Sequence, residues 1–526
     1  MRTQREQRSV ACVFGQDDQL LPVKWMLILA TVLIWGCSAT DAFAEVRSFS
    51  DSSISEAVKD ALMADPGVNA ALIDVETNEG IVTVSGTVNS ALAKDRATKV
   101  AETVKGVRGT VNTIEVAAPL RSDAEIRKDI EKAWLDDPAT ESYELAVSVK
   151  GGTATLTGTV GSWQERQLAA IVAKGVRGVR GVRNRIDIDY HEDRSDYEIK
   201  TEVQSALRWD VLVDDGLIAV DVKDNRVTLT GTVGSAREKT RAIADAWVTG
   251  VASVDADNLQ VASWARDERF RKNKYVHKTD AQIAEAVEDA LFYDPRVASF
   301  SVTVSVDDGT VTLSGEVDNL KAKYSAAQTA RNVVGVWRVK NNITVRPAAL
   351  GDSAIEDRVE QALLADPYVE RYEITVTVTG GEVYLYGDVD GYFEKAQAED
   401  IVSTVNGVAA VHNYLDVQTD YGAYSYNPYV DSWYPYAYSW GGYRDDYRAT
   451  KSDWEIKEDI DGELFWSPFV DADEVTVTVD DGVATLTGTV DTMSERSAAE
   501  KNAYDGGAVA VDNNLKAKYG PEYYRP

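Results

Sequence analysis

The chain has 526 residues, of which 86 are acidic and 55 are basic, so its formal net charge is −31. A field of that sign repels phosphate, which argues against nucleic acid as a partner and against broad adhesion to an anionic membrane. The apolar fraction of 44%, with 25 tyrosines and 12 tryptophans, suffices for ordered cores, so the acidity does not indicate a disordered chain.

The first 44 residues are typical of an export signal. Basic residues precede an apolar run from Trp25 to Trp35, and Ala42-Phe43-Ala44 provides the small residues of a cleavage site before Glu45. The apolar run is too short to span a bilayer comfortably. The sequence therefore predicts an exported protein of the periplasm.

Both cysteines, Cys12 and Cys37, lie in this leader. Ile34-Trp35-Gly36-Cys37 loosely resembles a lipobox, although its tryptophan fits the pattern poorly. Lipidation at Cys37, with outer-membrane association, is therefore a second interpretation. Cleavage after Ala44 leaves a chain without cysteine, which suits an oxidising compartment and excludes thiol catalysis and disulfides.

One short phrase recurs six times in the rest of the chain. It reads TVSGTV in its first copy, and an isoleucine lies 32 residues before the glycine of every copy. Such a fixed register indicates a tandem array of one small module. The six glycines are Gly86, Gly158, Gly231, Gly315, Gly387 and Gly488.

Each module begins with a predicted helix. Apolar residues lie at positions i, i+4 and i+8, as in Ile54, Val58 and Leu62, so the helix carries one apolar stripe. Asp-Pro or Ser-Pro follows most of these helices. Capping boxes are predicted at Ser122 with Glu125, Ser195 with Glu198, Thr279 with Gln282 and Ser452 with Glu455.

Two strands, a second helix and a third strand follow in each module. An alternating run such as Ser301 to Val306 predicts a half-buried strand, and turn residues such as Glu79-Gly80 join it to the glycine-bearing strand. The order αββαβ makes the second helix a crossover between parallel strands. We expect an α+β fold in which each module has two helices on one face of a three-stranded mixed sheet.

The repeat also sets the predicted domain boundaries. Because a core of about 70 residues is marginal by itself, the short-linked modules, one to three and four with five, are expected to lean on each other. We predict a signal peptide at 1-44, modules at 50-118, 122-190, 195-263, 279-347, 352-419 and 452-519, a basic linker at 264-278 and a Tyr/Trp-rich linker at 420-451.

The element order, the strand phrase and a closing phrase such as Gly106-Val107 followed by Asn112-Thr113-Ile114 resemble the BON domain, named for bacterial osmotically inducible and nodulation-related proteins. The resemblance covers nearly all of the chain after residue 50. It implies a non-enzymatic envelope module, with phospholipid contact, outer-membrane maintenance and osmotic stress as expected roles. The third module departs from the pattern at Asp257, and the sixth has lost one residue before Leu515, which fits an end cap.

The repeated glycine needs a physical reason, because glycine weakens a strand. It is retained where another part of the chain approaches closely or where the strand bulges. We expect the first helix to lie across it, and we interpret the six glycines as structural residues in preference to a ligand site.

The linker between modules three and four is strongly basic. One interpretation is a solvated linker helix, and the other is a docking strip for phosphate head groups or an acidic partner. The candidate interaction residues of this basic linker are Arg266, Arg269, Arg271, Lys272 and Lys274.

The linker between modules five and six is too aromatic for an ordinary flexible connection. Tyr and Trp side chains suit sites that are wet on one side and apolar on the other, such as membrane interfaces, sugars or protein partners. The alternative is that the segment folds back over neighbouring modules. Its candidate interaction residues are Tyr429, Trp433, Tyr434, Tyr436, Tyr438 and Trp440.

The sequence holds no catalytic constellation. His191, His277 and His412 fall at non-equivalent positions of different modules, and the aspartate pairs lack the spacing of a calcium loop. Gly175-Val176-Arg177-Gly178 resembles a KH-type GxxG, but the net charge argues against RNA. We therefore expect no enzymatic activity, no cofactor and no metal.

Two hypotheses for function remain open. In the first, the repeated modules bind a phospholipid surface or protein clients in envelope maintenance or osmotic stress, with avidity from several weak sites. In the second, the chain is a structural spacer or adhesion-like scaffold whose contact element is the aromatic linker. The oligomeric state is left open by the sequence.

Overall fold

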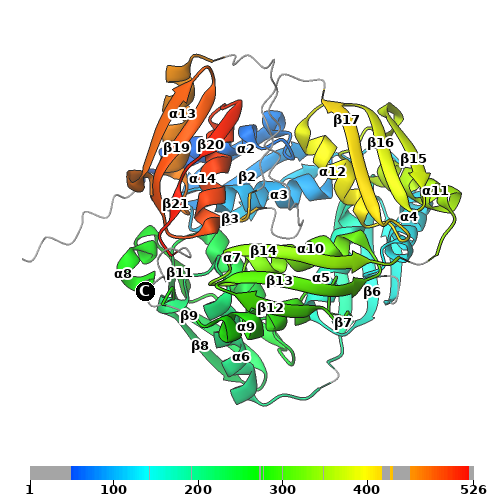
Figure 1. Cartoon of the computed structure of the whole chain (residues 1–526), viewed down its shortest axis with the longest axis horizontal. Helices are drawn as coiled ribbons and strands as arrows, with labels where there is room; N and C mark the ends of the chain where they lie inside the picture. The colour runs from blue at the N-terminus through cyan, green and yellow to red at the C-terminus, as the bar shows by residue number, and fades with distance from the viewer. Residues whose placement is uncertain are drawn as a thin grey trace, which may run out of the picture. The chain divides into compact units, whose positions relative to one another are not determined.

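Six αββαβ modules follow one another in the chain (Figure 1). The structure is a computed structural model that describes residues 49–417, 427–430 and 451–519, apart from positions 141, 142, 191, 272, 273, 277, 299 and 348. The predicted signal peptide and most of the aromatic linker lie outside the described residues. All six modules belong to one compact unit, Phe49–Pro526.

The first three modules contain the following elements. Module one has α2 (Asp51–Ala64), β1 (Ile73–Asn78), β2 (Ile81–Val88), α3 (Ala91–Glu102), β3 (Gly109–Asn112) and β4 (Glu115–Val116). Module two has α4 (Asp123–Asp136), β5 (Glu144–Lys150), β6 (Thr153–Val160), α5 (Trp163–Lys174) and β7 (Gly181–Ile188). Module three has α6 (Asp196–Trp209), β8 (Ile218–Lys223), β9 (Arg226–Val233), α7 (Ala236–Asp245), β10 (Ser253–Asp255) and β11 (Leu259–Val261).

The basic linker holds the 3-10 turn η3 (Ser263–Arg266) and the short helix α8 (Glu268–Arg271). Module four has α9 (Asp280–Phe292), β12 (Thr303–Asp307), β13 (Thr310–Val317), α10 (Leu320–Arg331) and β14 (Arg338–Val345). Module five has α11 (Asp352–Ala365), β15 (Ile374–Thr379), β16 (Glu382–Val389), α12 (Tyr392–Ser403) and β17 (Ala410–Val417). Module six has α13 (Asp453–Trp466), β18 (Val475–Asp480), β19 (Val483–Val490), α14 (Met493–Asp505), β20 (Ala510–Asn513) and β21 (Lys516–Ala517).

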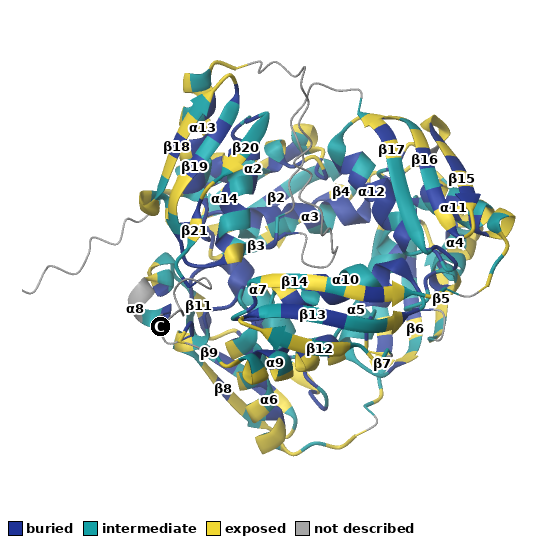
Figure 2. Ribbon diagram, in the orientation of Figure 1, coloured by how far each residue is buried: buried dark blue, intermediate teal, exposed yellow. Residues whose placement is uncertain are grey.

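The glycine-bearing strand is the central strand of every sheet. In module one it pairs antiparallel with β1, where Ile73 is opposite Gly86, and parallel with β3, where Ile81 is opposite Gly109. The apolar residues of the first helix, the inward strand residues and the second helix form one core in each module. The predicted fold class and the four predicted capping boxes are confirmed. Figure 2 shows how exposed residues alternate with buried or intermediate ones along strands such as β8 and β12.

An aspartate at the start of each first helix closes the hairpin of its own module. The carboxylate of Asp51 accepts hydrogen bonds from the amides of Glu79 at 2.8 Å and Gly80 at 2.9 Å. It thereby satisfies turn donors and also places negative charge at a helix N-terminus. The same contact recurs at Asp123, Asp196, Asp280, Asp352 and Asp453, and the sequence analysis missed it.

The expectation that the first helix lies across the repeated glycine is wrong. At Gly158, a Cβ atom would lie 2.1 Å from the carbonyl oxygen of Glu144, which begins the neighbouring strand β5, and the glycine has φ +131. The strand backbone itself therefore excludes any side chain, and the positive φ disfavours one. The same carbonyl contact recurs at Gly86, Gly231, Gly387 and Gly488.

Replacing Gly158 by alanine is expected to lower the free energy of unfolding by at least about 2 kcal/mol, because a Cβ there adds strain and moves the hairpin backbone. Gly391→Ala is the matched control, since Gly391 has no heavy atom within 4 Å of such a Cβ and no positive φ. Urea unfolding of both variants checks this. Equal stability of the two would show that the hairpin relaxes without cost.

One recurring backbone contact joins the modules in pairs, and two of the three pairs are distant in sequence. In each case the donor is the backbone amide that lies 19 residues after the repeated glycine of one module. The acceptor is the backbone carbonyl that lies 22 residues before the repeated glycine of the other module. This contact joins modules one and six, two and five, and three and four. The bonds are Lys105 to Trp466 (2.8 Å), Arg177 to Ala365 (2.5 Å), Asn406 to Asp136 (3.0 Å) and Val334 to Trp209 (2.9 Å). Modules two and five make it in both directions, so their pairing is self-complementary.

The short-linked modules also touch, as predicted. Lys174 of module two pairs with Asp95 of module one at 2.5 Å, and the ring of Trp163 stacks on Trp247 of module three at 5.7 Å. Lys321 of module four forms a buried ion pair with Asp400 of module five. The sixth module does not fit the expected end cap, because it contacts the first.

Candidate functional site

Arg266, Arg271 and Lys274 of the basic linker point inward and are at most 12% exposed. Arg271 contacts Asp491 at 2.9 Å and Glu495 at 2.7 Å in module six, and Asp214 at 3.0 Å in module three. Arg266 reaches the same Glu495 at 3.0 Å. These two guanidinium groups therefore fasten module six to module three.

Lys274 extends this fastening within module three. Its ammonium donates to the carbonyl of Leu207 at 2.9 Å and to that of Val213. Its side chain is only 2% exposed, so it is not presented to solvent. The assignment of Arg269 and Lys272 as interaction residues stays a prediction. The side chain of Arg269 and the whole of Lys272 lie outside the described residues.

The acids of this cluster respond differently to burial. Burial alone raises the pKa of Asp214, but Arg271, Arg266 and Lys274 together hold that pKa below its usual value. Burial and the neighbouring Glu495 raise the pKa of Asp491 to about 6, although Arg271 opposes them. The cluster is therefore an internal ion-pair network, in which loss of Arg271 strands buried carboxylates.

The described part of the aromatic linker lies against the modules. The Tyr429 side chain stacks on Phe469 of module six with centroids 3.3 Å apart, and its carbonyl accepts a hydrogen bond from Arg237 of module three. Val430 joins the core of module one. The segment thus links three modules at this point. Trp433, Tyr434, Tyr436, Tyr438 and Trp440 lie outside the described residues, and their role stays a prediction.

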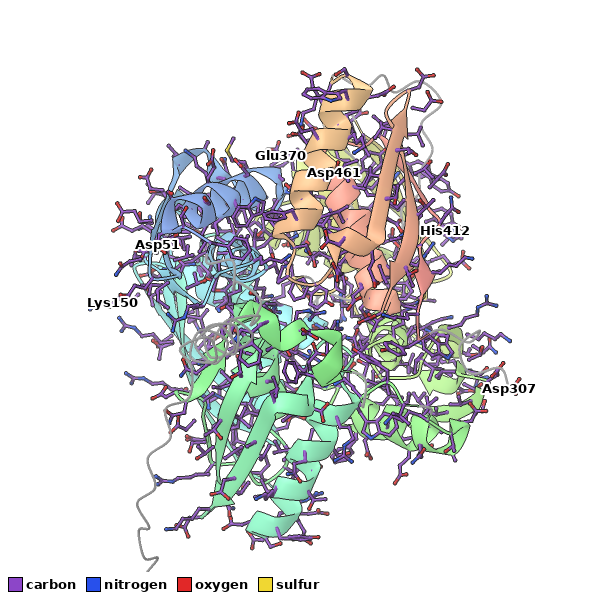
Figure 3. All side chains as sticks on the ribbon, turned by 90° about the vertical axis from the view of Figure 1, so that its left-hand side faces the viewer. Asp51, Lys150, Asp307, Glu370, His412 and Asp461 are labelled. Carbon is purple, nitrogen blue, oxygen red and sulfur yellow. The ribbon has the colours of Figure 1, made fainter. Side chains whose placement is uncertain are left out.

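The outer sheet face of module five carries an aromatic cluster that the sequence analysis did not single out. Tyr384 stacks on His412 at 4.5 Å, and Tyr386 stacks on Tyr414 at 5.4 Å, across strands β16 and β17. Tyr386 is 46% exposed and Tyr414 is 55% exposed. Figure 3 shows His412 at the outside of the protein. We call these four residues the aromatic face.

The other modules have small or polar residues where module five has its tyrosines. Threonine stands at every position equivalent to Tyr384, and serine or threonine at every position equivalent to Tyr386. The carboxylate of Glu382 borders the aromatic face, 2.9 Å from His412 and 3.1 Å from the hydroxyl of Tyr384. The contrast between YLYG and TLTG is the sequence signal that marks this surface.

Module two has a basic outer face instead. Arg183 and Arg185 are exposed on β7, with exposed Arg180 just before that strand and exposed Lys150 at the end of β5. None of the four is in an ion pair with another described residue. Figure 3 shows Lys150 pointing outward. We call these four residues the basic face.

The contact between modules one and six encloses a polar cavity of about 490 Å³ that is rich in carboxylates, including Asp60, Glu463 and Asp505. Burial and then Asp505 raise the pKa of Glu463 to about 7, with Lys501 opposing. Because this pKa lies above the unfolded value of 4.5, the folded state binds the proton more tightly. The resulting stabilisation is complete below the unfolded pKa and is lost as the pH rises through about 7.

Glu463→Gln is therefore expected to raise the free energy of unfolding at pH 8.5 by about 1–3 kcal/mol, and to change it little at pH 4.5. The variant cannot ionise, so it keeps the contact between modules one and six at alkaline pH. Urea unfolding at the two pH values measures the difference. If Glu463→Gln loses stability with rising pH as steeply as the parent, a group other than Glu463 causes the pH dependence.

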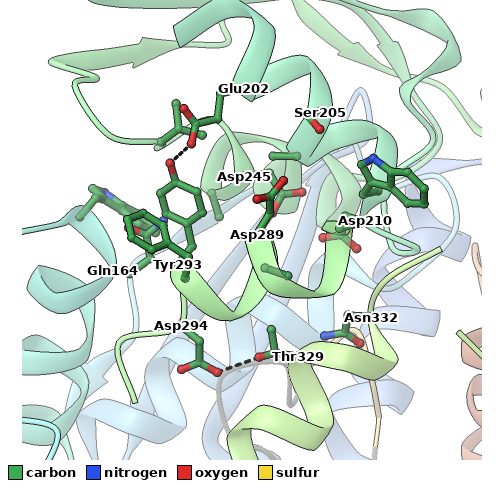
Figure 4. Close-up of a pocket in the computed structure, with 18 of the residues that line it drawn as sticks. Gln164, Glu202, Ser205, Asp210, Asp245, Asp289, Tyr293, Asp294, Thr329 and Asn332 are labelled. Carbon is green, nitrogen blue, oxygen red and sulfur yellow. Dashed lines mark hydrogen bonds between the residues drawn. The ribbon is translucent and has the colours of Figure 1, made fainter. Parts of the chain in front are cut away.

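A larger cavity, of about 750 Å³, lies between modules two, three and four. Helix α5 of module two, α6 and α7 of module three, and α9 and α10 of module four form its walls. Its polar groups include the hydrogen bond of Tyr293 to Glu202, and that of Thr329 to Asp294 at 2.7 Å (Figure 4). A volume of 300–1,000 Å³ is typical of small-molecule sites. We call this space the central cavity.

Metal and membrane-spanning features are absent from the described part of the chain. No group of three or more acidic, histidine or cysteine side chains there is arranged to hold a metal ion. Within the same residues, no helix is both long and apolar enough to cross a bilayer.

The family model of the BON domain matches residues 50–118, 122–190, 195–263, 279–347, 351–419 and 452–519. The chain therefore belongs to the BON domain family and carries six copies of the domain.

Two relatives share this domain. Osmotically-inducible protein Y of Escherichia coli K12 is 34% identical over 26% of this chain and 71% of its own length. Outer membrane lipoprotein DolP of Haemophilus influenzae is 33% identical over 26% of this chain and 75% of its own length. A solved structure of CdsD, a structural protein of the type III secretion system of Chlamydia trachomatis, is 11% identical and covers 39% of this chain and 91% of its own, with a TM-score of 0.12.

Proposed function

We propose that this chain is an exported, non-enzymatic envelope protein that binds protein clients during envelope maintenance or osmotic stress. Its membership of the BON family supports this role, as do the names of its relatives, an osmotically inducible protein and an outer membrane lipoprotein. The predicted export signal supports a periplasmic location.

The aromatic face of module five is the observation that carries the client hypothesis. Exposed clusters of large aromatic side chains on a folded surface mark interaction sites. Glu382 beside these rings and the net charge of −31 favour a partner segment that combines apolar with basic side chains, because Arg and Lys also stack on tyrosine. The other five modules lack this combination of two tyrosines on the central strand with an adjacent glutamate.

The spacer hypothesis is less well supported. An extended array would separate its first and last modules, whereas Lys105 of module one bonds to Trp466 of module six. The ring of Phe49 also packs against Trp466, with centroids 5.2 Å apart. Repeats that fold back on one another are suited to forming a binding surface. They are less suited to holding two ends at a fixed distance, as a spacer does.

The client hypothesis is tested with the triple variant Tyr384→Thr, Tyr386→Thr and Tyr414→Asn. Each substitution introduces a residue that other modules carry at the same position, so the fold is expected to persist. The chain from Glu45 onward is expected to suppress aggregation of an unfolded basic protein such as reduced lysozyme, and the variant to lose most of that effect. Trp454→Thr, at a residue 68% exposed in module six, is the matched control.

Full suppression by the triple variant would overturn the assignment of client binding to the aromatic face. Equal loss in the Trp454→Thr control would show that exposed aromatic area in general, and not this cluster, is responsible. Circular dichroism of each variant confirms that the modules remain folded.

Phospholipid binding is the second candidate function, and the basic face of module two favours it. Exposed Arg180, Arg183 and Arg185 with Lys150 offer cations to phosphate head groups on an otherwise acidic protein. Flotation with anionic and zwitterionic vesicles tests it. If the basic face docks, only anionic vesicles retain the protein, and Arg183→Gln with Arg185→Gln abolishes retention. Equal flotation of that variant would exclude this face.

A further inference from the structure

The central cavity has an apolar lining that no single module provides. Trp163 comes from module two, Trp209 from module three, and Tyr293 from module four. Large rings also stand exposed at its rim, where Tyr197 is 78% exposed and Phe292 is 59% exposed. Aromatic walls together with a few polar groups are the usual composition of a small-molecule site.

The charged groups of the cavity are unequal. Acidic residues in its lining outnumber the arginines, and each arginine is already engaged. Arg194 pairs with Glu202, Arg241 pairs chiefly with Asp210, and Arg296 pairs with Asp137 of module two at 3.0 Å. The walls therefore have carboxylate charge without a matching cation.

Among the acidic residues that outnumber the arginines, Asp245 on α7 is the one on which the inference rests. Its side chain is 11% exposed, and its Oδ1 lies 3.3 Å from Nε of Arg241, which Asp210 also contacts. Its Oδ2 is buried and accepts no hydrogen bond from an N–H or hydroxyl group of the described residues, while the carboxyl group of Asp210 lies within hydrogen-bonding reach of Asp245. Asp289 on α9 also lines the cavity and has no ion pair within the described chain. Figure 4 shows Asp245 and Asp210 among the residues around the opening.

We infer that the central cavity binds an organic cation, whose ammonium group donates to Asp245 and whose apolar body packs among Trp163, Trp209 and Tyr293. Aromatic rings attract cations through their faces, and a buried carboxylate favours a charged donor over water. An anionic ligand is disfavoured by the same excess of acids. This inference goes beyond the proposed client binding and uses different residues.

Without a cation, Asp245 is expected to hold its proton more tightly than an ordinary aspartate. Burial, and then the adjacent Asp210, raise the pKa of Asp245 well above its ordinary value, while Arg241 and Lys274 oppose this. Burial also raises the pKa of Asp289 across the cavity, as do Glu285, Glu202 and Glu288. Binding of an ammonium group to Asp245 therefore releases a proton, so affinity for the cation is expected to increase with pH.

The experiment compares three probes with the same alkyl chain, namely hexylammonium, hexanol and hexanoate, by calorimetric titration of the chain from Glu45 onward. The inference predicts saturable binding of one hexylammonium per chain, at least tenfold tighter than hexanol, with hexanoate weakest. Titration in two buffers of different ionisation heat is expected to show proton release. Affinity is expected to be greater at pH 8 than at pH 6, by at most about tenfold per unit.

Asp245→Asn is expected to reduce hexylammonium affinity at least tenfold and to abolish proton release, while hexanol binding is unchanged. Asp307→Asn, at an exposed residue of module four outside the cavity, is the matched control and is expected to bind as the parent does. Equal affinity for hexylammonium and hexanol would overturn the inference in favour of an apolar cavity. Absence of hexylammonium binding, or unchanged binding by Asp245→Asn, would also overturn it. None of these outcomes bears on the aromatic face.

Discussion

Replacing Arg271 by methionine is expected to lower the free energy of unfolding by about 3–5 kcal/mol, because it strands buried carboxylates of two modules. Arg271 is 8% exposed and lies within 3.0 Å of Asp214, Asp491 and Glu495. Methionine keeps much of the packing volume but provides no donor. The expected loss is concentrated at the contact between modules three and six, and urea unfolding measures it.

Arg346→Met is the matched control for this variant. Arg346 forms an ion pair with Glu316 at a similar distance of 2.9 Å, but the two side chains are 68% and 55% exposed. Exposed pairs of this kind contribute at most about 1 kcal/mol. Equal effects of the two substitutions would contradict the view that the basic linker fastens the modules together.

The second large effect is expected at the buried pair of Lys321 and Asp400, which joins modules four and five. The two side chains are 2% and 4% exposed. Burial lowers the pKa of Lys321, while Asp400 opposes that shift. Lys321→Met is expected to lower the free energy of unfolding by about 3–5 kcal/mol, since Asp400 then remains buried without its cation.

The double variant Lys321→Met with Asp400→Leu separates the pair from its surroundings. Removing both charges leaves no stranded carboxylate, so most of the lost stability is expected to return. Lys457→Met, in an exposed pair with Asp461 on α13, provides the control and is expected to cost about 0.5 kcal/mol or less. A double variant as unstable as Lys321→Met would show that packing, not charge, explains the loss.

The fold of each module was predictable because every signal for it is local and repeated six times. The apolar stripe with Ile54, the capping boxes and the hairpin turns each specify one element within a few residues. The reason for Gly86 was not predictable, because the carbonyl of Leu72 that excludes a side chain there depends on the hairpin geometry. The repeated sequence pattern thus indicated a structural role for the glycine, but it did not identify the carbonyl group that lies against it.

Contacts between modules were predictable only for those with short linkers. The residues that pair distant modules, such as Lys105 with Trp466, donate and accept through the backbone, which leaves no trace in side-chain chemistry. The charges of Arg271 and Asp491 lie 220 positions apart, so their pairing is not evident from sequence alone. In the sequence, the basic linker resembles a docking strip for an external partner. Only the fold shows that its cations pair with acids of modules three and six.

The candidate sites differ in how far the sequence specifies them. The aromatic face was predictable, because Tyr384 and Tyr386 stand where the other modules have threonine or serine. The central cavity was not predictable, because Trp163, Trp209 and Tyr293 come from three different modules, and the pKa of Asp245 is raised by burial and by Asp210, which only the fold brings about.

The pairing of modules one with six, two with five and three with four is tested most directly by amide hydrogen exchange. The amides of Lys105, Arg177, Val334 and Asn406 donate to carbonyls of another module. These four amides are therefore expected to exchange as slowly as the helix amides of their own modules, and removal of residues 420–526 is expected to release Lys105 alone. Rapid exchange at all four in the intact chain, with slow exchange in the neighbouring helices, would contradict the pairing.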